Sequence, residues 1–209
     1  AGELNTNSGS NYAVTVAGRT DIGPGSGGAD QATLTCNAST VSLGSGRTSS
    51  HALIINQGGT FVGGSGAHTI GSIDVKNNSN AKCTLTSGNT TVNSEKTGDD
   101  RNMVIAGSST FAHGGGTIIV TFAGTTHYDI DKTINNLTLN NASLVQKLSD
   151  SSVLAGNLTI TAGQFNANGR NLTVAGDVDV TGTLTGSSGA MSFGSLTINS
   201  GGTYSATSG

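Results

Sequence analysis

The strongest constraint on the fold is the internal repetition of a strand–turn–strand pattern. The segment LTINSGGTYSATSG at 196–209 aligns without a gap with LIINQGGTFVGGSG at 53–66 and with MVIAGSSTFAHGGG at 103–116. A shorter relative, LTITAGQFNANG, occupies 158–169. Units of this kind bury one face only against their neighbours, so the repetition indicates a stacked β architecture.

Short stretches of alternating apolar and polar residues dominate the rest of the chain, and no amphipathic helical pattern is found. Similar strands begin at Asn136, Asn157 and Asn171. Their spacing fits a coil of about 14 to 24 residues, with two or three short strands in each coil. The sequence therefore predicts an all-β fold in the form of a single elongated β-helix, or β-solenoid.

A β-sandwich or jelly roll is the alternative fold, because it also consists of short alternating strands with frequent turns. Aromatic residues make up only 4% of the chain and Trp is absent, which leaves few large side chains for a two-sheet core. The repeats also favour the solenoid. The predicted core positions are Val14, Leu34, Leu53, Ile55, Leu85, Ile105, Leu137, Leu139, Leu158, Ile160, Leu172, Val174, Leu196 and Ile198.

The domain organisation is predicted to be one solenoid domain over 1–209. Its N-terminal part, 1–31, is expected to be irregular, and a protruding loop is expected near 94–102, where the charge cluster EKTGDDR lies. The segment 196–209 is a repeat without an evident cap, and solenoids usually carry capping elements. We therefore expect the native chain to continue beyond Gly209.

Charge and hydropathy argue against two classes of partner. The formal net charge is −3 and there is no basic run, which argues against a nucleic-acid partner. No apolar stretch approaches the roughly 18 to 20 residues that a membrane-spanning helix needs. Charged residues make up only 10% of the chain, and Ser, Thr, Asn and Gly are abundant. That composition favours a virion surface or an extracellular or cell-surface location.

The order of elements in the second half of the chain carries a family resemblance. GGTIIVTFAG at 115–124 is followed by INNLTLNN at 134–141, LAGNLTITAG at 154–163 and NLTVAGD at 171–177. This order resembles the glycine- and threonine-rich β-helix repeats of tailed-phage virion proteins, especially of marine phage, and of bacterial surface proteins. The resemblance covers roughly the last 100 residues well and the first 100 loosely. It implies a fold and an exterior setting, and no catalytic residue is carried over with it.

Several pairs of carboxylates have a spacing that is compatible with catalysis or with metal binding. Asp177 and Asp179 lie on one face of a predicted strand, about 6.6 Å apart, a spacing that glycoside hydrolysis or Ca²⁺ binding can use. Asp129 and Asp131 share this spacing, and Asp99 and Asp100 lie in the charge cluster. A solvated strand face or loop is the preferred interpretation of each pair.

The histidines and cysteines show no metal-ligand spacing. The four histidines lie far apart in the sequence: His51, His68, His113 and His127. His68 and His113 stand beside glycine turns, so they are expected in surface loops. The alternative is that they bind a metal on the three-fold axis of an oligomer. Cys36 and Cys83 occupy apolar-face positions, as free buried thiols or as a disulfide, with free thiols preferred. We predict no catalytic, cofactor-binding or metal site.

The predicted function is that of a non-enzymatic structural protein of a virion exterior: a capsid decoration, fibre or spike component in the form of a rigid rod. A homo-oligomer is expected, for example a trimer. The expected partners are other virion or surface proteins and a host glycan. The alternatives are a bacterial adhesin or extracellular filament subunit and, as a minor one, a tailspike-like carbohydrate-active enzyme.

Overall fold

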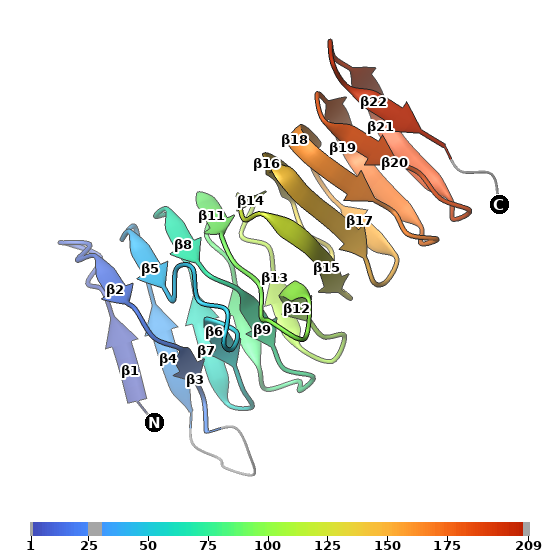
Figure 1. The fold of residues 1–209 in the computed structure, drawn as a ribbon. Helices are drawn as coiled ribbons and strands as arrows, with labels where there is room; N and C mark the ends of the chain where they lie inside the picture. The colour runs from blue at the N-terminus through green and yellow to red at the C-terminus, as the bar shows by residue number, and fades with distance from the viewer. Residues whose placement is uncertain (1, 25–30, 207–209) are drawn as a thin grey trace.

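The computed structural model describes residues 2–24 and 31–206, and every regular element in this part is a β-strand. All pairings between these strands are parallel. The chain advances from one end of the molecule to the other, with the two termini at opposite ends (Figure 1). The all-β prediction is confirmed.

In the N-terminal half the strands fall into three rows, which the chain visits in turn. The first row is a five-stranded sheet of β1 (Gly2–Asn5), β4 (Ala32–Thr35), β7 (Gly59–Val62), β10 (Lys82–Thr84) and β13 (Thr110–Ala112). The second row contains β2 (Val14–Val16), β5 (Val41–Leu43), β8 (His68–Ile70), β11 (Asn89–Val92) and β14 (Thr117–Val120). The third row contains β3 (Thr20–Ile22), β6 (Leu53–Ile55), β9 (Ile73–Val75), β12 (Arg101–Ile105) and β15 (Gly124–Ile130).

The C-terminal half combines four longer strands, each of which passes through two rows, with three strands of three residues that lie in one row each. Its strands are β16 (Asn136–Leu148), β17 (Ser152–Leu154), β18 (Leu158–Asn166), β19 (Leu172–Val180), β20 (Thr183–Thr185), β21 (Met191–Ile198) and β22 (Thr203–Ser205). The start of β16 pairs with β14 and its end pairs with β15, so this one strand joins the second and third rows. The result is a second, 17-stranded sheet.

The prediction of a single elongated β-solenoid is wrong. The parallel strands are β-helix-like, but they form a nearly closed barrel of strands plus a second sheet. Single strands such as β16 cross from row to row, and the five-stranded sheet ends at β13. The repeats could not reveal this, because strand–turn–strand patterns record local conformation and not how far a row continues.

Part of the predicted irregular segment 1–31 lies outside the described residues, namely residue 1 and residues 25–30; the rest of that segment contains β1, β2 and β3. The segment near 94–102 forms a turn that contacts an earlier loop. The Thr97 amide donates to the Thr48 carbonyl, and the Ser94 hydroxyl donates to the Arg47 carbonyl.

The core is narrow and consists of columns of side chains in register. In the first row, Leu34, Phe61, Cys83 and Phe111 are successive partners and form one such column. Eleven of the predicted core positions are buried: Leu34, Leu53, Ile55, Leu85, Ile105, Leu137, Leu139, Leu158, Ile160, Leu172 and Val174.

Three of the predicted core positions are not buried. Val14 is only partly buried. Leu196 and Ile198 are 39% and 42% exposed, because no described strand stacks on that part of β21.

The first row is interrupted between β13 and residue 134. No described strand pairs with the far edge of β13, and the row resumes with an isolated parallel bridge between Ile134 and Leu154. Connector length gives the reason. From β12 to β14 the chain uses residues 106–116, which include β13, but from β15 to β16 it uses only residues 131–135. Five extended residues reach about 17 Å at most, so this connector takes a direct route and does not lie along β13.

Asparagine side chains connect successive turns of the C-terminal half. Asn136 Oδ1 accepts from the Asn157 amide at 2.8 Å, and Asn157 Oδ1 accepts from the Asp177 amide at 2.9 Å. A Cβ on Gly176 would lie 2.1 Å from Asn157 Oδ1, so glycine is required where this side chain passes. These bonds satisfy backbone amides at corners, where the strand ladder does not reach them.

Ile160 and Ile198 allow a matched test of the core, because both are register partners of Val180. Ile160 is fully buried and Ile198 is 42% exposed. We expect Ile160→Ala to lower the free energy of unfolding by about 3 kcal/mol and Ile198→Ala by less than about 1 kcal/mol. Chemical denaturation measures both; equal losses would contradict the burial of this column.

Candidate functional site

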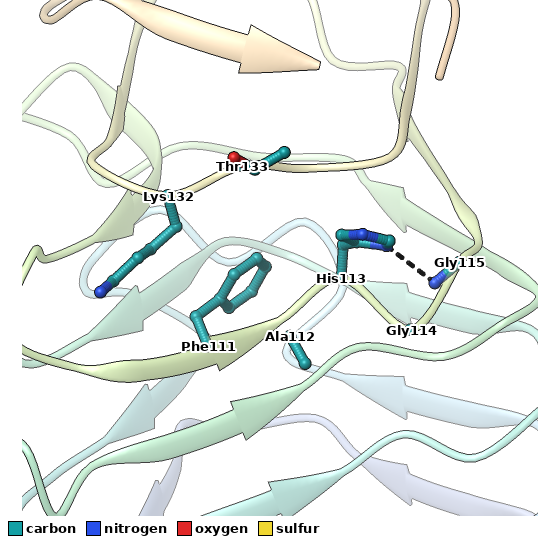
Figure 2. Close-up of a pocket in the computed structure, with 7 residues that line it drawn as sticks. All are labelled: Phe111, Ala112, His113, Gly114, Gly115, Lys132 and Thr133. Atoms are coloured by element: carbon teal, nitrogen blue, oxygen red, sulfur yellow. Dashed lines mark hydrogen bonds between the residues drawn. The ribbon is translucent and has the colours of Figure 1, made fainter. Parts of the chain in front are cut away.

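The interruption of the first row opens a pocket of about 730 Å³. Figure 2 shows its lining, with β13 and the glycine turn after it on one side and the 132–133 connector on the other. The lining residues are Phe111, Ala112, His113, Gly114, Gly115, Lys132 and Thr133. The pocket is therefore a direct consequence of the short connector described above.

Phe111 supplies the apolar surface of the pocket. It is the last member of the Leu34–Phe61–Cys83 column, and it packs against the core with one side. Phe61, at the equivalent position two strands earlier, is fully buried, whereas Phe111 is only partly buried. The difference arises because no strand covers Phe111, which leaves aromatic surface open at the pocket.

The polar groups of the pocket come from both of its sides. His113 Nδ1 accepts a hydrogen bond from the Gly115 amide at 3.0 Å, so Nε2 is the ring nitrogen left to donate (Figure 2). The Gly115 carbonyl accepts from the Asn135 side chain, which ties the turn to the connector. Lys132 has no carboxylate partner within the part of the chain that the structure describes. The pocket thus combines an aromatic surface with an unpaired cation.

A cluster of three carboxylates lies nearby in the chain. Asp129 and Asp131, which share a strand face in sequence, are joined by Asp150, and ligand atoms of the three lie within 4.8 Å of one another. It is the one group with metal-ligand spacing among the described residues. Arg101 Nη1 lies 3.2 Å from Asp129 Oδ2 and already supplies a positive charge there. Burial raises the pKa of Asp129, and Asp150 and Asp131 add to this shift while Arg101 opposes it.

The other predicted carboxylates do not gather into a site. Asp177 and Asp179 lie on β19, and Asp177 accepts a hydrogen bond from the Ser195 hydroxyl at 2.6 Å. Asp99 lies 3.0 Å from Lys96 Nζ. The hydrogen bond from Lys96 is the main reason why the pKa of Asp99 is lowered.

Two of the four histidines are buried, and for His68 the expectation of a surface loop is wrong. His68 is 1% exposed within β8. Its ring packs edge-on against the ring of Phe61, with 5.8 Å between the two ring centroids. His68 is the first residue of β8, directly after the glycine turn, and it is the register partner of Val41 and of Thr90. Burial lowers the pKa of His68 to about 4.

The remaining histidines differ in their surroundings. His51 is also buried, with Nε2 at 3.6 Å from Asp99 and 4.0 Å from Asp74. Burial lowers the pKa of His51, and both carboxylates oppose that shift. His113 lines the pocket, and His127 lies in β15 beside Lys147. The four rings stay apart, with no two of them in one cluster of ligands within the described chain.

Both cysteines are free and buried. Burial raises the pKa of Cys36 to about 12 and raises that of Cys83 further. Because the thiolate is the reactive form, both side chains behave as small apolar groups.

Sequence reasoning missed Phe111, Lys132 and Asp150 as members of clusters. The only available signal was the length of the connector between the strands that end at Ile130 and begin at Asn136. It becomes meaningful only when the pairing of these strands is known.

No family model, curated protein or solved structure matches the chain. Within the described residues there is no helix long and apolar enough to cross a membrane.

The carboxylate cluster generates a stability prediction. Because Asp129 is partly buried beside two like charges, we expect Asp150→Asn to raise the free energy of unfolding at pH 7 by about 0.5 kcal/mol at low salt. Added salt should reduce the gain. Asp179→Asn removes a charge outside the cluster and serves as the control. Denaturation at two ionic strengths measures the effect; a loss of stability in Asp150→Asn would contradict repulsion within the cluster.

His68 generates a prediction about pH. Its pKa in the folded state is lowered from 6.5 to about 4. Between these two pH values the unfolded chain binds a proton at His68 and the folded chain does not. The free energy of unfolding therefore falls as pH drops from about 6.5 to about 4. We expect His68→Leu to remove at most about 3 kcal/mol of that fall. His51 contributes in both proteins, so the difference between their unfolding curves isolates His68. Identical pH dependence would contradict the buried neutral ring.

Proposed function

We propose that the chain is a non-enzymatic structural protein of a virion exterior, as a capsid decoration, fibre or spike component. The observation that carries the proposal is the turn-to-turn bonding of the body. Parallel strand ladders and asparagine side chains tie each turn to the next one. The resemblance of residues 115–186 to phage and bacterial surface repeats, drawn from the sequence, supports the same setting.

The proposal does not include the rigid elongated rod that the sequence predicts. A rigid elongated rod depended on the single solenoid, which the two-sheet structure contradicts. What supports the proposal is the turn-to-turn bonding and the low content of charged residues, 10% of the chain. Outward positions carry short polar side chains, such as Thr15 in β2, Thr69 in β8 and Thr173 in β19. Homo-oligomers and contacts with other virion or surface proteins belong to the proposal.

A bacterial adhesin or extracellular filament subunit is the second candidate. The open pocket beside Phe111 favours it, because an adhesin needs a recognition surface and a decoration protein does not. The carbohydrate-active enzyme has less support: Asp177 and Asp179 lie on β19, and neither lines the pocket.

Immunogold electron microscopy of the native source tests the proposal, with an antibody raised against this chain. We expect gold on phage heads or tails. The control is the same antibody after adsorption with purified chain, which should remove the label. Gold on cell envelopes or on free filaments would contradict the virion assignment and make the protein an adhesin or filament subunit.

A further inference from the structure

We propose that the pocket between β13 and residues 132–133 binds an acidic saccharide, a sugar that carries a carboxylate or a sulfate group. The inference gives a site and a chemical class to the glycan contact that the sequence predicts, and it does not depend on the virion assignment. It rests on the pocket's aromatic surface, its unpaired cation and its free backbone groups.

The aromatic surface of Phe111 matches the apolar face of a sugar ring. A pyranose presents a face of C–H groups, which packs on an aromatic ring and leaves the hydroxyls at the edge free. Phe111 is anchored in the core column through Cys83 and is open on the pocket side. Covering apolar surface that is now in water is favourable by about 25 cal/mol for each Å².

Lys132 supplies the charge that selects an acidic sugar. Figure 2 shows its side chain on one side of the Phe111 ring and the His113 imidazole on the other. Lys132 forms no ion pair with any carboxylate of the described residues, and Asp131, next to it in sequence, accepts from the Gly107 amide at 2.9 Å. The ammonium group is available to pair with a carboxylate or sulfate beside the stacked ring.

Backbone and side-chain groups are available for the sugar hydroxyls. The Thr110 amide donates to Ala81, and the Ala112 carbonyl accepts from Leu85, so both of these groups face β10. Groups alternate along a parallel strand, so the amide and carbonyl of Phe111 face the gap. The Thr133 hydroxyl and His113 Nε2 add further partners.

The dimensions favour a saccharide over an extended peptide. A volume of about 730 Å³ falls within the range of about 300–1,000 Å³ that is usual for small-ligand sites. A peptide that adds to a sheet edge gains affinity from a run of main-chain bonds. β13 spans only three residues, Thr110–Ala112, and only Phe111 among them faces the gap.

Isothermal titration calorimetry with defined oligomers tests the proposal. The probes are a hyaluronan tetrasaccharide (carboxylate), a chondroitin sulfate tetrasaccharide (sulfate and carboxylate), neutral cellotetraose and tetraglutamate. We expect saturable binding of at least one acidic tetrasaccharide, with Kd about 0.1–1 mM. The two acidic probes show whether sulfate adds to carboxylate. Cellotetraose and tetraglutamate should bind at least about tenfold more weakly.

The variants separate the pocket from general charge effects. Lys132→Gln and Phe111→Leu should each weaken binding of the acidic tetrasaccharide by about tenfold. Lys147→Gln removes a lysine of β16 outside the pocket and should leave binding unchanged. Thermal unfolding confirms that each variant is folded; if Phe111→Leu does not fold, Lys132→Gln alone decides.

Three results would overturn the proposal: no binding of either acidic tetrasaccharide, equal binding of tetraglutamate, or equal weakening by Lys147→Gln and Lys132→Gln. A preference for tetraglutamate would indicate a peptide ligand instead. None of these outcomes bears on the immunogold labelling, so failure of this inference leaves the proposed function standing.

Discussion

The parallel backbone ladder between successive turns is the interaction on which the rest of the structure depends. Each turn contains too few apolar residues to form a core alone, so its inward side chains are buried only by the turns on either side. Columns such as Leu34–Phe61–Cys83 show this directly, because each member is covered by its register partners. Where the ladder has no next strand, as at Ile198, the same residue type becomes exposed.

The candidate site follows from a single failure of this ladder. The connector over residues 131–135 is too short to lay a strand along β13, so the row stops at Phe111 and resumes at Ile134. The second and third rows continue through β16, which keeps the two halves joined. An aromatic core residue and a lysine thereby become the two sides of a pocket.

Local patterns predicted local structure well. Alternation identified the strands and eleven of the inward positions, because residues two apart in a strand share a face. Free buried cysteines were also expected correctly. The single elongated solenoid was wrong, since which strands pair and where a row ends depend on connector reach. The burial of His68 was missed because a glycine-rich segment indicates a turn but not the residue at which the next strand begins, which here is His68.

The candidate site could not be predicted from the sequence, for the same reason. Phe111, His113 and Lys132 come from two turns, and nothing in their spacing places them together. The Asp129–Asp131 pair was visible, but Asp150 joins it only through strand pairing across a turn. The phage-type setting stays a prediction from the sequence, while the pocket is a feature of this chain's own connector lengths.

Amide hydrogen exchange at Phe111 tests the interrupted row most directly. Phe61 and Phe111 both pair with Cys83, but Phe61 has strands on both sides and Phe111 has a strand on one side only. Residue-resolved exchange by NMR should show a strongly protected Phe61 amide and a Phe111 amide that exchanges orders of magnitude faster. Equal protection of the two amides would mean that the connector pairs with β13, and it would contradict both the gap and the pocket.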